Sequence, residues 1–111
     1  MYVWKVLYMP EAEVERAALD ARERQAVYNA VRKLEAEGLS LGYPHSSAVV
    51  GAENLRELRP RGGRSAWRAL YRRVGEVFVI AAVGPEAQSD KRGFDRACEA
   101  ALKRLGELEE G

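Results

Sequence analysis

The chain has 111 residues, of which 47% are hydrophobic and 32% are charged, and its formal net charge is +1. This length suits one domain over residues 1–111 with a single core. The composition is typical of a soluble globular protein and excludes an intrinsically disordered chain. No apolar run approaches the ~20 residues that a membrane-spanning helix needs, so we expect no membrane partner.

The single cysteine, Cys98, excludes an internal disulfide framework and a zinc site built from several cysteines. The N-terminal segment 1–10 is apolar but has neither a basic leader nor a small-residue cleavage site, so we do not interpret it as a signal peptide. We therefore expect the protein to act in the cytoplasm. The sequence contains no phosphate-cradling glycine loop and no metal-ligand cluster, and we expect no cofactor.

The first predicted strand covers Tyr2–Tyr8, which is rich in β-branched and aromatic residues. Pro10 fits the first position of a helix, with acidic residues in the first turn where the helix dipole favours them. Asp20 and the glutamate three residues later have capping-box spacing, which predicts a second helix start. Gly38 predicts the helix end. Residues 11–37 are therefore two helices, or one bent helix, packed on a sheet.

The segment Leu39–Asn54 carries glycine, proline and serine and is predicted to be an irregular connection. Three strands are predicted after it: Leu55–Arg59, Ala66–Arg73 and Glu76–Val83. The turns between them are short, so the strands should be antiparallel. The third strand is apolar on both alternating faces, which suits a central strand covered on both sides.

A last helix is predicted from apolar residues that recur at helical spacing from Phe94 to Leu108, with Ser89 or Asp90 as its cap. The elements therefore follow in the order strand, helices, three-stranded meander, closing helix. This order predicts an α+β domain. Its small antiparallel sheet combines the N-terminal strand with the meander, beside an N-terminal helical pair and a C-terminal helix.

Seven arginines and a single acid lie in residues 56–73, so this segment carries a charge of +6 and the rest of the chain a charge of −5. Because side chains alternate along a strand, Arg68 and Arg72 share one face while Trp67 and Tyr71 share the other. Guanidinium groups beside aromatic rings suit a nucleic-acid backbone, since arginine offers a planar fork of donors to phosphate and aromatic faces stack bases.

The alternative is that these arginines have no binding role and form the solvated outer face of a half-buried sheet, partly paired with Glu57 or Glu76. For two other single residues, we favour a structural role over a catalytic one. His45, in the irregular connection, is interpreted as an exposed loop histidine rather than an acid–base group. Cys98 falls on the apolar stripe of the last helix, where a buried small hydrophobe is favoured over a nucleophile.

Four short motifs follow one another in the middle of the chain: Glu57-Leu58-Arg59, Gly63-Arg64, Trp67-Arg68-Ala69-Leu70-Tyr71 and the apolar run Val77–Val83. Their order and spacing resemble the RelE/ParE superfamily of bacterial toxins, in particular its HigB-like and phage-derived branch. The segment Val31–Ser46 is similar to the second helix of that family and the loop after it. The closing helix also fits, so the resemblance covers about the whole chain.

The resemblance implies the toxin of a type II toxin–antitoxin pair, with a cognate antitoxin as its partner. Such toxins enter the ribosomal A site and cut mRNA without a metal, by aligning a ribose 2′-hydroxyl with the adjacent phosphate. It implies that Arg59, Arg64 and Arg68 bind and polarise phosphate and that Glu57 is the candidate base. Tyr71 would stack on RNA or support the core, and we favour the core. Further candidate RNA-binding residues are Arg56, Arg61, Arg72, Arg73, Lys91, Arg92 and Gln88.

The sequence departs from the family pattern after the apolar strand. Many relatives have a basic pair there, whereas residues 84–88 read Gly-Pro-Glu-Ala-Gln, of which only Gln88 matches. Lys91 and Arg92 would supply positive charge from displaced positions. Phe94 stands where RelE proper has a tyrosine early in its last helix.

Two further functions therefore stay open. One is a ParE-like inhibitor of DNA gyrase, with which the missing basic pair is compatible and against which the Glu-Leu-Arg motif argues. The other is a toxin fold that has lost catalysis and serves as a binding or regulatory module.

Overall fold

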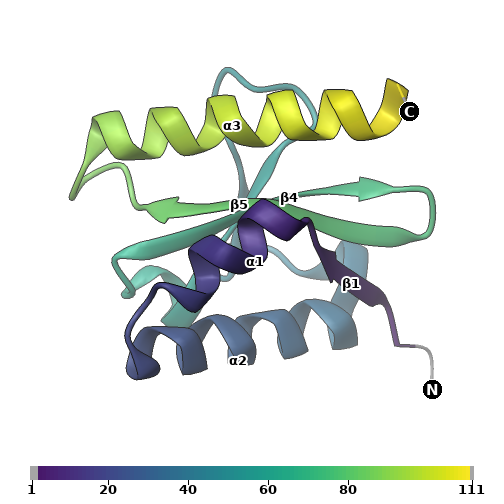
Figure 1. Cartoon of the computed structure of the whole chain (residues 1–111). Coiled ribbons are helices and arrows are strands. Elements are labelled where there is room, and N and C mark those ends of the chain that lie inside the picture. Colours follow the sequence, from purple (N-terminus) through teal and green to yellow (C-terminus); the bar gives the residue numbers. More distant parts are fainter. Residues whose placement is uncertain (1–2, 111) are drawn as a thin grey trace.

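A five-stranded mixed sheet separates two helical layers in the computed structural model, which describes residues 3–110 (Figure 1). The strand order is β1-β5-β4-β3-β2, and β1 is parallel to β5 while the other neighbours are antiparallel. The strands are β1 (Lys5–Tyr8), β2 (Ser46–Ala48), β3 (Arg56–Leu58), β4 (Trp67–Val74) and β5 (Val77–Pro85). The helices are α1 (Pro10–Ala17), α2 (Ala21–Glu37) and α3 (Lys91–Glu110), with short 3-10 turns η1 (Gly38–Ser40) and η2 (Pro60–Gly63). The predicted α+β class and the meander are confirmed, whereas the sheet, predicted to be antiparallel, is mixed because the N-terminal strand joins β5 in parallel.

The central strand β5 is covered on both faces, as its apolar sequence predicts. Phe78 and Ile80 point into a core that they share with α1 and α2, whereas Val79 and Ala81 point into a second core beneath α3. Alternation also holds on β4, where Leu70 belongs to the α3 side and Tyr71 to the α2 side, despite a register shift between them. The two faces of one sheet therefore carry two separate hydrophobic cores.

The two N-terminal helices are separate. Asp20 caps α2 by accepting a hydrogen bond from the Glu23 amide at 2.9 Å, and Pro10 is the first residue of α1. Asp90 caps α3 in the same way, accepting from the Gly93 amide at 2.9 Å. Along α3, Phe94 is buried, whereas Leu108, at the end of the predicted apolar stripe, is exposed.

Two strand predictions need correction. The first strand begins at Lys5, because the Trp4 amide donates to the Glu35 carbonyl of α2 at 2.8 Å and so leaves the ladder; Tyr2 lies outside the described residues. The predicted irregular segment Leu39–Asn54 contains the edge strand β2, which pairs with β3. Its sequence, Ser-Ser-Ala, lacks apolar alternation, and the strand forms because its backbone pairs with β3 while the Ser46 hydroxyl bonds the Tyr71 hydroxyl at 2.6 Å.

A polar clamp fixes α3 to α1 across β5. Arg104 of α3 pairs with Glu15 of α1 at 2.9 Å and donates to the Ala81 carbonyl of β5 at 2.8 Å. The same carboxylate accepts a hydrogen bond from the Val83 amide at 3.0 Å, where β1 no longer reaches along β5. The clamp thus supplies hydrogen-bond partners to the Ala81 carbonyl and the Val83 amide of β5, which β1 does not reach, and ties α3 to the sheet.

Candidate functional site

A groove of about 890 Å³ lies between α3 and the β2–β3 side of the sheet. Its walls come from β2 and the loop after it, from β3, from the loop before β4, from the loop between β5 and α3, and from α3 itself. Six residues that the sequence predicts as functional line it: Glu57, Arg59, Arg64, Arg68, Gln88 and Lys91. The strand alternation and the short turns therefore bring residues that are distant in sequence, such as Glu57 and Gln88, into one site.

Glu57 is the centre of a charged cluster inside this groove. Its Oε1 accepts a hydrogen bond from the Arg59 guanidinium at 2.7 Å and another from Nε of Arg68 at 3.3 Å. The carboxylate is 13% exposed and Arg59 is 18% exposed, so both can still be reached from solvent. Two cations around one carboxylate leave a net positive charge at this point, which favours an anionic ligand.

Arg68 is the buried member of the cluster, at 4% exposure. Its guanidinium donates to the carbonyls of Ser65 at 2.7 Å, Trp67 at 2.9 Å and Gly63 at 3.2 Å. Burial, followed by the neighbouring Arg59, lowers the pKa of Arg68. Most of its donors are thus committed to the loop before β4, and Arg68 holds that loop in place.

Arg64 is the exposed cation that this loop presents. Its side chain donates from Nε to the Arg61 carbonyl at 3.1 Å, which leaves the outer guanidinium nitrogens to a ligand. The loop turns through left-handed backbone at Arg61, Gly62 and Gly63. A side chain at Gly63 would meet the Arg59 guanidinium, because an added Cβ would lie 2.5 Å from it. Gly63 therefore permits the close approach of Arg59 to the loop.

The opposite wall is formed by the segment after β5, which lacks the basic pair found in many of the toxins that the sequence resembles. Glu86 accepts hydrogen bonds from the Ser89 hydroxyl and from the Gln88 amide, and the Ser89 bond is the main reason that the pKa of Glu86 is lowered. Lys91, at the start of α3, is exposed and pairs with Asp95 at 2.8 Å. This wall thus offers one amide side chain and one ammonium group to the groove.

The structure places the other predicted RNA-binding arginines elsewhere. Arg56 lies on the α2 side of the sheet and donates to Ser46 Oγ at 3.0 Å. Arg72 shares the face of Arg68 but lies about 13 Å further along β4, where it pairs with Glu109 of α3 at 2.7 Å. Arg92 is exposed on α3 and does not line the groove.

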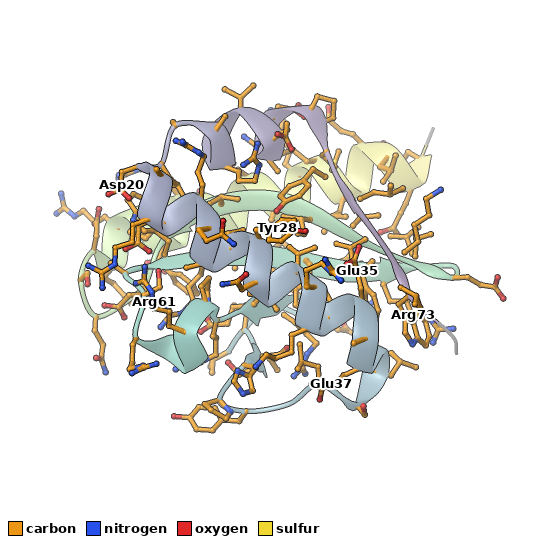
Figure 2. The ribbon with its side chains drawn as sticks, turned by 90° about the horizontal axis from the view of Figure 1, so that it is seen from below. Asp20, Tyr28, Glu35, Glu37, Arg61 and Arg73 are labelled. Carbon is orange, nitrogen blue, oxygen red and sulfur yellow. The ribbon has the colours of Figure 1, made fainter. Side chains whose placement is uncertain are left out.

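Arg61 and Arg73 lie at opposite ends of the molecule (Figure 2). Arg61 points to the start of α2, with Glu23 at 3.3 Å. Arg73 lies near the other end of α2, over the Trp4 ring at 5.7 Å. The alternative that the arginines are surface residues paired with acids therefore holds for Arg61 and Arg72, although their partners, Glu23 and Glu109, are distant in sequence.

Sequence reasoning missed Tyr43, whose exposed ring lies 5.1 Å from the Arg59 guanidinium. An aromatic residue directly before proline in a predicted loop is the signal that could have found it. Tyr71 is buried in the core, as expected. Cys98, expected to be buried, is only partly buried and lines the groove, and burial raises the pKa of its thiol to about 11.

Metal sites and membrane spans are both absent from residues 3–110. No group of three or more His, Cys, Asp and Glu side chains in this range is placed to hold a metal ion. None of the helices in this part of the chain combines the length and apolar character of a membrane span.

Comparison with solved structures places this fold among RelE toxins. A mutant of the Escherichia coli toxin RelE in the free state superposes with a TM-score of 0.65 over 93% of this chain and 98% of that chain, at 14% identity. The RelBE2 toxin–antitoxin complex from Mycobacterium tuberculosis gives a TM-score of 0.57 at 27% identity, over 78% of this chain and 95% of the matched one. The intact Escherichia coli RelBE toxin–antitoxin complex gives 0.54 at 16% identity, over 75% and 96%.

No curated protein sequence matches the chain. A family model does: the phage-derived Gp49-like proteins match residues 15–91, which span the segment from α1 to the first residue of α3 and include every wall of the groove except the body of that helix. The chain therefore belongs to the Gp49-like family of phage-derived proteins and has the fold of RelE toxins.

Proposed function

We propose that this protein is the toxin of a toxin–antitoxin pair and that it cleaves mRNA on the ribosome, in the cytoplasm, without a metal. The observation that carries the proposal is the cluster in the groove. Glu57 sits between Arg59 and Arg68, and the exposed Arg64 stands at the rim. This set combines a carboxylate with cations that can hold one phosphate, which is what cleavage by a neighbouring 2′-hydroxyl requires.

In the proposed reaction, the 2′-oxygen of a ribose attacks the adjacent phosphorus. A bond from phosphorus to the 2′-oxygen forms and the bond to the 5′-oxygen of the next nucleotide breaks, giving a 2′,3′-cyclic phosphate and a 5′-hydroxyl. Arg59 and Arg64 hold the phosphate and stabilise its developing negative charge. The hydrogen bonds from Arg59 and Arg68 both reach Oε1 of Glu57, so Oε2 is the atom that receives the 2′-hydroxyl proton. The candidate donor to the leaving oxygen is Lys91, on the α3 wall.

The proposed protein partner is an antitoxin. Two of the similar structures are complexes of RelE-type toxins with antitoxins. A groove with a net positive cluster suits an acidic segment of such a partner, which would compete with RNA for the same arginines.

One observation favours a second candidate, a ParE-like inhibitor of DNA gyrase. The segment after β5 carries Glu86 rather than the basic pair of many relatives, so the wall opposite Glu57 is poorer in cations than a nuclease would use. A toxin fold without catalysis and with a binding role is the third candidate, and the same observation favours it.

The test is a cell-free translation reaction in which the message is mapped by primer extension. We expect new message ends with the wild-type protein and about a 100-fold slower appearance with Arg64→Ala, which removes one charge-stabilising donor. Arg96→Ala is the matched control, because Arg96 is exposed on α3 and does not line this groove. Intact message with unimpaired translation would contradict the nuclease, and inhibition of gyrase supercoiling by the same preparation would then support the second candidate.

A further inference from the structure

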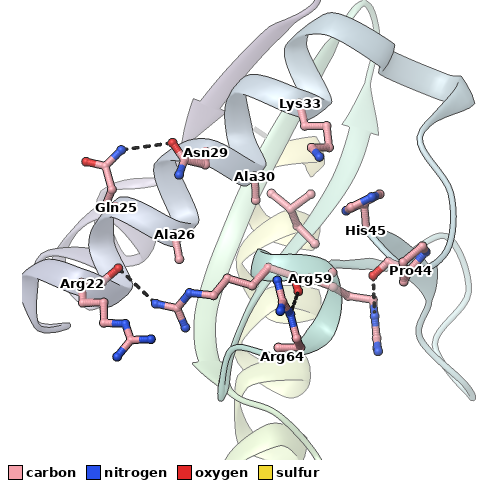
Figure 3. A pocket seen from close by; sticks show the side chains of 13 residues that line it. Arg22, Gln25, Ala26, Asn29, Ala30, Lys33, Pro44, His45, Arg59 and Arg64 are labelled. Carbon is pink, nitrogen blue, oxygen red and sulfur yellow. Dashed lines mark hydrogen bonds between the residues drawn. The ribbon is translucent and has the colours of Figure 1, made fainter.

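A second groove, of about 680 Å³, lies between α2 and the η2 loop (Figure 3). Its floor is apolar. Ala26 and Ala30, one helical turn apart on α2, line it together with Leu58 of β3; the alanines are 5% and 8% exposed, and Leu58 is fully buried beneath them. Because the alanine side chains are short, they leave space above the α2 surface for a flat group such as a planar ring. A floor of this kind suits the face of a planar ligand more than a large aliphatic side chain, which needs a deep pocket.

The rim of the second groove is basic. Arg22 and Lys33, at the two ends of the α2 face, are exposed and form no ion pair with any residue in 3–110. Arg61 reaches across one end to the Arg22 carbonyl at 3.4 Å and to Glu23 at 3.3 Å, both long bonds that a ligand can replace. No carboxylate from the described residues lines this groove. Its ligand should therefore be an anion.

The second groove continues from the first. Arg59 and Arg64 line both, and Arg59 is fixed between them by its bonds to Glu57 at 2.7 Å and to the Pro44 carbonyl at 3.0 Å. A ligand that runs from one groove to the other passes these two guanidinium groups. A chain of phosphates matches that arrangement, because each phosphate can take one fork of donors.

Two amide side chains lie on the α2 wall. Gln25 and Asn29 are exposed, line the groove and bond each other, with Gln25 Nε2 donating to Asn29 Oδ1 at 3.0 Å (Figure 3). Each amide offers a donor and an acceptor, which is the combination that reads the edge of an unpaired base. Amides beside a flat apolar floor and a basic rim are the three elements of single-stranded RNA recognition.

We propose that the second groove binds an unpaired nucleotide of the message next to the bond that is cut. Its phosphate lies on Arg59 and Arg64, its base lies on the alanine floor, and Gln25 and Asn29 contact the base edge. This inference rests on the proposed function and adds to it the part of the site that selects which nucleotide sequence of the message is cut. An acidic amphipathic helix of a protein would complement the basic rim, but it would not extend past Arg59 and Arg64 into the first groove as a nucleotide chain would.

Binding can be tested apart from cleavage with a fluorescein-labelled 2′-O-methyl hexaribonucleotide, which lacks the attacking hydroxyl and cannot be cut. Fluorescence anisotropy would compare wild type with Arg22→Glu/Lys33→Glu. We expect the double variant to bind at least about tenfold more weakly, with a salt dependence whose slope is shallower by about 0.7 for each phosphate that is no longer neutralised. The matched control is Lys5→Glu/Lys103→Glu, which makes the same charge change at exposed residues outside both grooves.

The second arm tests selection. Gln25→Ala/Asn29→Ala changes only exposed amides, so the fold should persist, and we expect primer extension to show a changed distribution of cut sites, measured as the fraction of all cuts at each position. Equal hexanucleotide binding by the reversal and control variants, with an unchanged cut-site distribution, would overturn the inference and leave the nuclease in place. Groove-dependent binding with uncut message would support the groove and contradict the nuclease.

The third arm addresses the protein ligand. A labelled peptide with leucine and glutamate at helical spacing would be titrated against the same variants. If this peptide binds in a way that Arg22→Glu/Lys33→Glu abolishes, while the hexanucleotide does not bind, the groove is a protein-docking site and the inference is wrong.

Discussion

The arginines of the basic segment divide into buried and exposed members with different tasks. Arg68 is buried and bonds the carbonyls of Gly63, Ser65 and Trp67, whereas Arg64 is exposed on the loop that these bonds hold. In the proposed reaction we therefore expect Arg68 to act through the positions of Arg64 and Arg59 rather than by direct contact with RNA. Mutation of Arg68 alone would confound a loss of chemistry with a displaced loop.

This division predicts that one substitution lowers stability and that another lowers activity. Arg68→Lys keeps the charge but cannot supply the same fork of donors, so we expect a loss of about 1–3 kcal/mol in the free energy of unfolding. Arg64→Ala should change stability by less than about 0.5 kcal/mol while it slows cleavage about 100-fold. Urea unfolding checks both. Equal stability losses in the two variants would contradict the assigned roles.

Cys98 lines the first groove but should react slowly. Burial, and next the charge of Asp95, raise the pKa of its thiol from 9.0 to about 11. The thiolate fraction near neutral pH should then be about 100-fold below that of an unperturbed thiol. We expect iodoacetamide to modify the folded protein slowly, with a rate that climbs until the pH approaches 11. Mass spectrometry would follow the reaction, with protein in urea as the reference, and matching rates in the two states would refute the prediction.

Among the elements, the end of α2 depends on one glycine. Gly38 has a φ of +56°, and an added Cβ would lie 2.0 Å from the Trp4 indole. Gly75, in the β4–β5 turn, has a similar φ of +62° but open space around it. Gly38 also has a ψ of −128°, outside the left-handed helical region, so a side chain there meets both backbone strain and the indole, whereas one at Gly75 has open space around it.

We expect Gly75→Ala to cost about 1–2 kcal/mol of unfolding free energy, which is the strain of the left-handed backbone. Gly38→Ala should cost clearly more, since Trp4 must also leave its contact with Phe78. Thermal unfolding followed by tryptophan fluorescence would measure both. A smaller loss for Gly38→Ala than for Gly75→Ala would be inconsistent with this packing.

The position of α3 above the groove depends on the clamp between Arg104 and Glu15. Arg104→Met keeps the aliphatic stem but leaves the Ala81 carbonyl and the Glu15 carboxylate without their partner. We expect a loss of about 1–3 kcal/mol and faster amide exchange in α3 than in α2. Hydrogen exchange with mass spectrometry resolves the two helices. Uniformly faster exchange would mean that the clamp stabilises the whole molecule rather than α3.

At the scale of the whole molecule, local patterns in the sequence predict most of the fold. The central strand, the helix caps and the strand faces follow from periodicity and capping chemistry, which are local. β2 could not be predicted, because its Ser-Ser-Ala sequence carries no pattern and the strand exists only through pairing with β3.

The site was predictable in part for the same reason. Short local motifs identified Glu57, Arg59 and Arg68 as candidates through their resemblance to a toxin family, and the fold brings these residues together with Gln88 in one groove. Arg72 was assigned to the same site but pairs with Glu109, 37 residues away, because α3 runs along the full length of the sheet. The second groove could not be foreseen, since α2 and the η2 loop meet only in the folded chain.

The central claim is that the groove around Glu57 cuts ribosome-bound message. The most direct measurement is a single-turnover time course on ribosomes programmed with an end-labelled message and a vacant A site, with chemical analysis of the new ends. We predict a cut within the A-site codon that yields a 2′,3′-cyclic phosphate and a 5′-hydroxyl. It should form about 100-fold more slowly with Arg64→Ala, form at the wild-type rate with Arg96→Ala, and be absent from the same message without ribosomes. Message that stays intact on programmed ribosomes, or cuts that Arg64→Ala leaves unchanged, would contradict the account.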